Sequence, residues 1–255
     1  MSNQMIANIT LKKRTFKVNL NAPLDLSIPI RGTGRNVNAW YADPPRITPY
    51  REGEFVASVS EGASINFNDI YFNPHAHGTH TETLGHITAE PCSINKQLKK
   101  YFSLAEVITI APEGHGEDRC ISRIQLEYAL KDKDCSAVVI RTLPNTGQKK
   151  TRHYSHKNPP YMLEDAAQYL VDRNVQHLLI DLPSVDKEKD EGALVAHRAF
   201  WNMDGKKRMD ATITEFIYVP NKVLDGTYLL ELQTAAFEND AAPSRPVLYK
   251  IMKDE

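Results

Sequence analysis

The run of residues from His75 to His86, HAHGTHTETLGH, constrains this chain more than any other feature. It places four of the nine histidines within twelve residues, together with the carboxylate of Glu82. The glycines and β-branched threonines between them disfavour an α-helix, so the sequence predicts a strand or a loop. On a strand, alternate side chains share a face, which would bring His80, Glu82 and His86 together. The small Gly78 would leave room beside them.

These residue types indicate a site for a divalent metal. Imidazole nitrogen and carboxylate oxygen are ligands of catalytic zinc, and manganese accepts a similar mixture. Taken singly, His80 and His86 could be structural histidines, and Glu82 a surface carboxylate. Because histidine is the commonest metal ligand, a chance cluster on a polar loop is the weaker interpretation. We therefore expect a divalent metal cofactor, with Zn²⁺ favoured and Mn²⁺ second.

The same run resembles the H-x-G-T-H-x-D-x-P-x-H signature of the cyclase-like metal hydrolases, which include bacterial kynurenine formamidase and isatin hydrolase. The matching positions are Gly78, Thr79, His80, Glu82 and His86. Weaker similarity in later blocks extends the resemblance over roughly residues 54–251. The resemblance implies a swivelling β/β/α fold.

Three positions depart from that signature. Glu82 stands where the family has Asp, and Leu84 stands where it has Pro. The first histidine of the signature falls on Ala76, which has a histidine on either side. A one-residue local insertion would let His75 fill this position, and His77 is the other candidate. We favour His75.

Two later residues, His197 and Glu215, resemble the remaining metal ligands of the family. The loop between them is longer than in family members because of an insertion around residues 202–208. Asp181 and Asp186 flank a Leu-Pro-Ser segment, and they are better explained as turn-formers or as partners of ligands. They would be the next candidates if a late ligand were wrong.

The resemblance implies a role for each of these residues. The direct metal ligands would be His75, His80, Glu82, His197 and Glu215. A divalent cation lowers the pKa of its bound water toward about 7 and polarises a carbonyl. His86 would be the general base and acid that carries a proton from water to the leaving nitrogen. Trp40 is the best aromatic wall for a substrate pocket.

The implied activity is hydrolysis of C–N bonds other than peptide bonds, in a small amide, formamide or cyclic amide, as in arylformamidases. A non-catalytic metal-binding scaffold or sensor on the same fold is the alternative. A serine hydrolase is disfavoured because Ser184 lacks the G-x-S-x-G elbow. A cysteine hydrolase is disfavoured because no base adjoins Cys92, Cys120 or Cys135.

The composition is that of an ordinary globular protein, with 41% hydrophobic and 25% charged residues. A net charge of −1 gives no reason to expect a nucleic acid or a membrane as partner. No apolar run approaches the roughly 20 residues that span a bilayer, and residues 1–20 lack the apolar core of a signal peptide. We expect a cytoplasmic enzyme with free thiols. We also expect a small-molecule amide substrate and a homodimer or higher homo-oligomer, as family relatives tend to form.

Hydrophobic patterns predict many strands and few helices. Ser122 and Gln125 form a capping-box pattern that opens a helix to about residue 131, and a second helix is expected over residues 162–173. Residues 31–53 are expected to be irregular. Strands are expected over residues 54–60, 64–72, 104–111, 137–143, 177–182, 215–219, 227–232 and 246–251, the last three as an antiparallel set. We predict a single α/β domain over residues 1–255, of the swivelling β/β/α type with mixed, largely antiparallel sheets.

Overall fold

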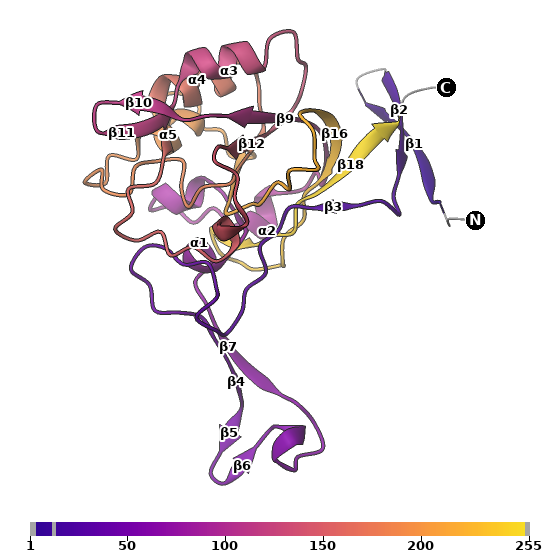
Figure 1. The fold of residues 1–255 in the computed structure, drawn as a ribbon, viewed down its shortest axis with the longest axis vertical. Helices are drawn as coiled ribbons and strands as arrows, with labels where there is room; N and C mark the ends of the chain where they lie inside the picture. The colour runs from indigo at the N-terminus through magenta and orange to yellow at the C-terminus, as the bar shows by residue number, and fades with distance from the viewer. Residues whose placement is uncertain (1–3, 12–13, 253–255) are drawn as a thin grey trace.

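One large sheet organises the computed structural model, which describes residues 4–11 and 14–252 (Figure 1). The strands follow the order β1-β2-β18-β16-β9-β12-β14-β15-β8-β17, and β3 also pairs with β18. Their bounds are β1 Ile6–Leu11, β2 Arg14–Asn19, β3 Leu24–Asp25, β8 His80–Glu82, β9 Phe102–Ile110, β12 Ala137–Thr142, β14 His177–Ile180, β15 Thr212–Glu215, β16 Gly226–Glu231, β17 Ala241–Pro243 and β18 Val247–Met252. The predicted mixed α/β fold is confirmed.

The centre of the sheet is parallel and buried on both faces. β9, β12, β14 and β15 run parallel, whereas β8, β16 and β18 pair in antiparallel fashion. Along β12, Val138 and Ile140 join one apolar core, and Val139 joins a second core on the opposite face. Burial on both faces explains why the predicted central strands are continuous apolar runs in the sequence.

Three helices cover one face of the sheet: α3 (Arg123–Ala129), α4 (Glu164–Asp172) and α5 (Val195–Phe200). The predicted capping box starts α3, because the side chains of Ser122 and Gln125 each accept a hydrogen bond from the other's backbone N–H. α4 begins two residues later than expected, since Met162 belongs to a short strand, β13 (Tyr161–Met162), that pairs with β11 (Asp118–Ile121). The remaining elements on the body are α1 Pro74–His77, η2 Leu84–Ile87, α2 Ile94–Gln97, β10 Glu113–His115, β11 Asp118–Ile121, η3 Gly147–Lys150 and β13 Tyr161–Met162.

An arm projects from the body at the end opposite α3 and α4 (Figure 1). Within it, β4 (Arg46–Pro49) pairs with β7 (Asn68–Tyr71), and β5 (Arg51–Glu52) pairs with β6 (Phe55–Val56). The expected strands over residues 54–60 and 64–72 are therefore wrong in extent. Residues 31–53, which were expected to be irregular, contain β4 and β5, and Gly53, at φ +57°, turns the chain from β5 into β6. The strand expected over residues 54–60 is interrupted by η1 (Val59–Glu61). The arm exposes the large apolar side chains of Ile47, Phe55, Val59, Ile65, Phe67, Ile70 and Tyr71.

The strand expected over residues 215–219 lies earlier in the chain, as β15. It pairs in parallel with β14 and in antiparallel fashion with β8, so it does not belong to the predicted antiparallel set. The other two members of that set, β16 and β18, do pair in antiparallel fashion. Phe216 ends the strand because it adopts φ +53°, a left-handed conformation that a strand cannot contain. Glu215 therefore stands at the carboxyl end of β15, directly beside β8.

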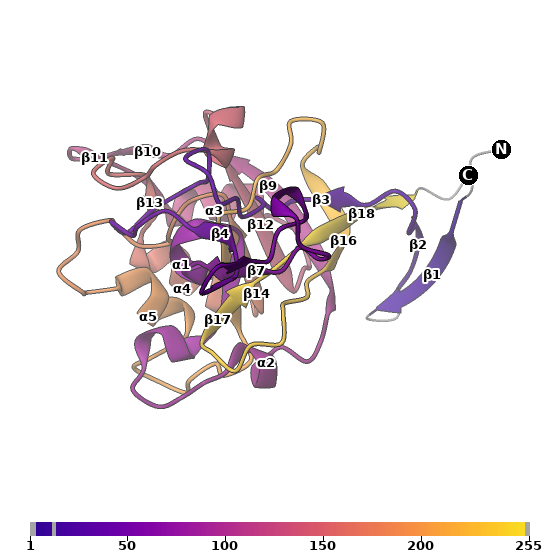
Figure 2. The ribbon, with the colours of Figure 1, turned by 90° about the horizontal axis from the view of Figure 1, so that it is seen from below.

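Figure 2 looks along the arm and shows β1 and β2 extending from the side of the body beside β18. Within residues 4–11 and 14–252, no helix has the length and apolarity to cross a membrane. The three cysteines are free, as expected, and all three are buried. Burial raises the pKa of the Cys135 thiol to about 11, so this thiol is protonated at neutral pH.

Candidate metal centre

The histidine-rich run folds as three short pieces, α1, β8 and η2, rather than as one strand. The expectation that no helix forms here is wrong for the first turn. Asn73 caps that turn by accepting a hydrogen bond from His75 N at 2.9 Å, and Pro74 occupies its first position. His86 also leaves the expected strand because Thr83 caps η2.

Gly78 joins α1 to β8 and permits close packing. A Cβ atom placed there would lie 2.9 Å from Ile30 Cγ1 and 3.2 Å from the carbonyl oxygen of Ile28. The first distance is well inside the optimal separation of about 3.5–4.0 Å between carbon atoms. The room expected beside the ligands is therefore filled by residues 28–30, and glycine is needed for this contact.

Strand pairing brings two carboxylates to His80. β8 lies between β15 and β17, and Glu215 at the end of β15 is opposite His80. His80 Nε2 lies 3.5 Å from Glu215 Oε2 and 3.9 Å from Glu82 Oε2. His80 Nδ1 donates to the carbonyl oxygen of Gly78 at 3.0 Å, which directs Nε2 toward the two acids. The side chains of His80, Glu82 and Glu215 form the centre of a cluster, and all three are buried.

His197 approaches the same carboxylates from α5. Its Nε2 lies 3.0 Å from Glu82 Oε1 and 3.8 Å from Glu215 Oε1. Each of these glutamates therefore directs one oxygen toward His80 and the other toward His197. The result is two neighbouring groups of donor atoms that share both carboxylates.

The structure separates the two candidates for the first histidine of the signature. His75 Nδ1 lies 3.0 Å from Glu82 Oε2, within the cluster. His77 is buried, and its Nδ1 accepts a hydrogen bond from Asn73 N at 2.8 Å. In the described part of the chain, three groups of side chains could each share one ion; two of them include His75, and none includes His77.

Asp181 and Asp186, the next candidates for a metal ligand, occupy different environments. Asp186 lies 2.6 Å from His197 Nδ1 and so contacts a cluster member. Asp181 lies 2.7 Å from Lys149 Nζ and accepts hydrogen bonds from Thr142. Asp186 is therefore a partner of a candidate ligand, and Asp181 belongs to a separate buried ion pair.

The charges of the cluster are mutually dependent. Burial alone would raise the pKa of Glu82, but the imidazoles of His86 and His197 hold it well below its usual range. Burial alone would lower the pKa of His75 and His197, yet their acidic neighbours raise both, that of His75 to about 10. The positive charge of protonated imidazoles balances the negative charge of the buried carboxylates here. A divalent cation can balance that negative charge in the same way.

The donor atoms fit a divalent cation. His80 Nε2 is buried without a hydrogen-bond partner, which is costly unless a ligand satisfies it. Atoms that share one zinc ion, each about 2.0–2.2 Å from it, lie about 3–3.5 Å apart. Three of the contacts above, at 3.0, 3.5 and 3.0 Å, fall in this range. Imidazole and carboxylate together suit zinc or manganese.

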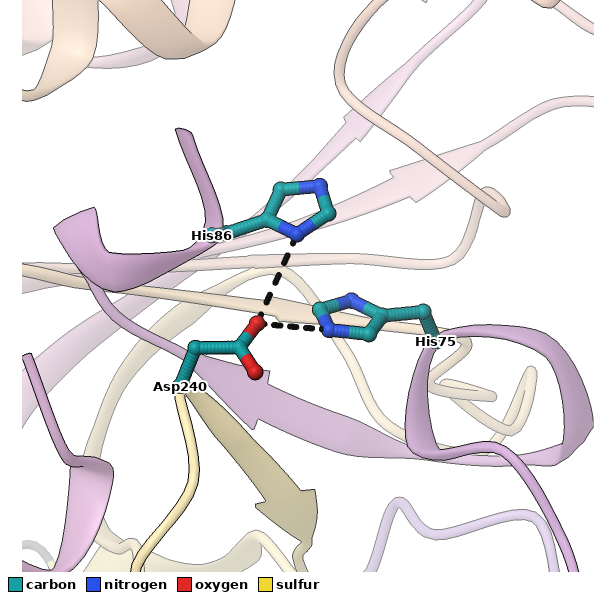
Figure 3. Close-up of side chains that lie close together, drawn as sticks. All are labelled: His75, His86 and Asp240. Atoms are coloured by element: carbon teal, nitrogen blue, oxygen red, sulfur yellow. Dashed lines mark hydrogen bonds and ion pairs between the residues drawn. The ribbon is translucent and has the colours of Figure 1, made fainter. Parts of the chain in front are cut away.

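His86 lies on the open side of the cluster, beside an acidic residue that the sequence did not indicate (Figure 3). The side chain of His86 is 31% exposed, and its Nδ1 lies 3.9 Å from Glu82 Oε2 and 3.5 Å from Asp240 Oδ2. Asp240 Oδ2 also lies 2.8 Å from His75 Nε2. In sequence, Asn-Asp before β17 is typical of a turn. Only the pairing of β17 with β8, which places Ala241 opposite Glu82, reveals that Asp240 joins the cluster.

Trp40 lies against the turn that carries His75. Its indole Nε1 donates a hydrogen bond to the carbonyl oxygen of His75 at 3.1 Å. The half-buried ring packs on a small apolar core that includes Tyr154 and Phe216. Trp40 therefore supports α1, and the expected contact with substrate stays a prediction.

The fold and this cluster define a mixed α/β protein whose His/Glu centre is built across neighbouring strands of one sheet. The chain belongs to the cyclase family. The family model described as "Putative cyclase" matches residues 24–187, which is more than half of the chain and includes the histidine-rich run. A search of curated proteins found no match.

Solved structures share the fold at low sequence identity. A predicted metal-dependent hydrolase from Bacillus stearothermophilus is 19% identical, with a TM-score of 0.63 over 89% of this chain and 98% of that one. Isatin hydrolase A from Labrenzia aggregata, bound to benzyl benzoate, is 12% identical, with a TM-score of 0.66 over 91% of this chain and 94% of that one. An isatin hydrolase bound to the product analogue thioisatinate is 14% identical, with a TM-score of 0.63 over 90% and 92%.

Proposed function

We propose that this protein is a metal-dependent hydrolase that cleaves the C–N bond of a small amide, formamide or cyclic amide. The observation that carries the proposal is the buried cluster in which the carboxylates of Glu82 and Glu215 meet the imidazoles of His75, His80 and His197. The structural neighbours support this reaction class, since they include a predicted metal-dependent hydrolase and two isatin hydrolases.

These five residues would hold the cation. Zinc is favoured because three imidazoles contribute, and manganese is the second candidate. When bound, such a cation supplies a Lewis acid that acidifies water and polarises the scissile carbonyl. The chain itself contributes the burial of the ligands, which excludes competing solvent from most of the cluster.

His86 is the proposed general base and acid. Its imidazole stacks on that of His75, with ring centroids 4.3 Å apart, so it stands beside the ligands. Because its side chain is partly exposed, a substrate can reach it from the open side of the cluster. From this position it can take a proton from the attacking water and return one to the leaving nitrogen.

The proposed substrate is small and carries an amide carbonyl. Isatin is a cyclic amide, so the two isatin hydrolases among the neighbours favour cyclic amides within this class. Trp40 is the proposed aromatic contact, because its ring lies against the turn that carries His75.

Chelation tests this function. Purified protein is analysed for metals, stripped with a chelator, reloaded with Zn²⁺ or Mn²⁺, and assayed on a panel of formamides, lactams and isatin at each stage. We expect hydrolysis to disappear on stripping and to return on reloading. Full activity in protein verified as metal-free would contradict the proposal. Protein that binds metal but cleaves nothing in the panel would instead support the non-catalytic scaffold or sensor.

A further inference from the structure

We infer that Asp240 is a positioning residue that fixes the imidazoles of His75 and His86, the first as a metal ligand and the second as the general base. The inference rests on the proposed hydrolase function and adds to its site a residue outside the signature. Figure 3 shows the Asp240 carboxylate facing both rings, with contacts from one of its oxygens to each of them.

The two nitrogens of His75 face different acids. Nδ1 lies 3.0 Å from Glu82 Oε2, inside the buried cluster, and Nε2 lies 2.8 Å from Asp240 Oδ2, on its open side. A histidine that binds a metal is neutral, so its imidazole carries one proton and one lone pair. An ionised Asp240 accepts a proton-bearing Nε2, so the lone pair of Nδ1 is directed into the cluster.

The same arrangement occurs once more in the centre. His197 Nδ1 lies 2.6 Å from Asp186, while its Nε2 faces Glu82 at 3.0 Å. Asp186 and Asp240 thus each stand behind one imidazole that faces an oxygen of Glu82. In metal sites, a carboxylate behind a histidine sets its tautomer and ring orientation.

Asp240 reaches His86 as well. His86 Nδ1 is 3.5 Å from the same Asp240 oxygen that contacts His75. With Nδ1 held toward Asp240, the Nε2 atom of His86 is the nitrogen left to exchange a proton with substrate. One carboxylate therefore orients both a ligand and a base, which explains why their rings stack.

The backbone around Asp240 is built to hold it there. Its carbonyl oxygen accepts hydrogen bonds from Thr83 N at 3.0 Å and from Thr83 Oγ1 at 3.2 Å. The next residue, Ala241, begins β17 opposite Glu82. These contacts use backbone atoms of Asp240, so substitution of its side chain leaves them in place.

The test compares Asp240→Ala and Asp240→Glu with Asp118→Asn. Asp118 is a matched control because it accepts hydrogen bonds from Asn158, Tyr161 and Lys187, outside the metal centre. We expect Asp240→Ala to weaken zinc binding, measured by chelator competition, about 10–100-fold and to lower kcat more than it raises KM. Asp240→Glu should recover part of both losses, and Asp118→Asn should change neither.

Three results would overturn the inference. The first is an Asp240→Ala protein with the zinc affinity and kcat of the control. The second is a rise in KM alone, which would make Asp240 a substrate contact. The third is loss of one bound zinc ion from a two-ion protein, which would make His75, His86 and Asp240 a metal site of their own.

A measurement on the unmodified protein keeps the inference testable if a variant fails to fold. In zinc-loaded protein, ¹⁵N NMR of the imidazoles should place the His75 proton on Nε2, and a proton on Nδ1 would overturn the inference. Failure of the proposed function is a separate outcome. If the unmodified protein binds zinc but hydrolyses nothing, the function is wrong, while zinc affinity and the His75 tautomer still test Asp240.

Discussion

Asp186 Oδ2 lies 2.6 Å from His197 Nδ1, and both side chains are buried. The same carboxylate accepts backbone hydrogen bonds from Ala196 at 2.7 Å and from His197 at 3.2 Å. It therefore holds both the start of α5 and the ring that α5 carries. Because Nδ1 is engaged with Asp186, Nε2 is the nitrogen that faces Glu82.

Asp186→Asn should weaken zinc binding by about 10–100-fold, because the amide no longer stabilises the His197 tautomer that presents Nε2. Chelator competition measures this change. Asp190→Asn is the matched control, since Asp190 lies in the same loop and its carboxylate accepts hydrogen bonds from the backbone N–H groups of Gly192 and Leu194, outside the metal centre. Equal zinc affinity in the two variants would show that Asp186 serves only the loop and α5.

The sequence predicted the elements whose pattern is local. β9, β12 and β14 are apolar runs buried on both faces, and α3 begins at the capping box of Ser122 and Gln125. The prediction from sequence failed where the backbone conformation of one residue decides where a strand ends or turns. Gly53 at φ +57° folds the arm back on itself, and Phe216 at φ +53° ends β15. Neither angle leaves a periodic trace in the sequence.

The metal centre shows the same difference between residues that a local pattern predicts and residues that it does not. Period-two spacing correctly put His80 and Glu82 on one strand, β8, but it wrongly extended that strand to His86, which lies on η2. It gave no information about His75, which lies on α1. The position of Asp240 depends on β17 pairing with β8, which joins segments more than 150 residues apart. Pairing between such distant segments is set by the packing of the whole sheet, which no local pattern encodes.

His80→Ala and His86→Ala should separate metal binding from turnover. His80 is fully buried with an unpartnered Nε2, so its loss should remove zinc from the purified protein. His86 is partly exposed, so its loss should leave zinc in place and lower kcat about 10²–10⁴-fold, the usual effect of removing a general acid or base. Elemental analysis and kcat on the best substrate measure the two effects.

His115→Ala is the control for both variants, because His115 lies exposed on β10. It should retain the zinc content and kcat of the unmodified protein. A His86→Ala protein with nearly unchanged kcat would show that His86 is not the base. A His80→Ala protein with full zinc content would remove His80 from the ligand set.

The arm should mediate self-association with a second copy of the chain. A two-stranded ribbon is marginally stable alone in water, and exposed apolar patches mark interaction surfaces. Ile70→Ser should shift the protein toward monomer in sedimentation velocity, because Ile70 is 60% exposed on β7. Ile124→Ser is the control, since Ile124 is 76% exposed on α3, away from the arm. Unmodified protein that sediments as a monomer would contradict this prediction.

His177 should make the fold less stable in acid. Burial lowers its pKa from 6.5 to about 4, with Arg208 and Lys100 acting in the same direction and Asp210 against it. The unfolded chain therefore binds more protons between these values, so stability is full above pH 6.5 and falls as pH drops toward 4, by up to about 3 kcal/mol. In urea titrations with chelator present, His177→Asn should lose less stability than the unmodified protein between pH 7 and pH 5. Equal losses would mean that His177 does not contribute to the acid sensitivity.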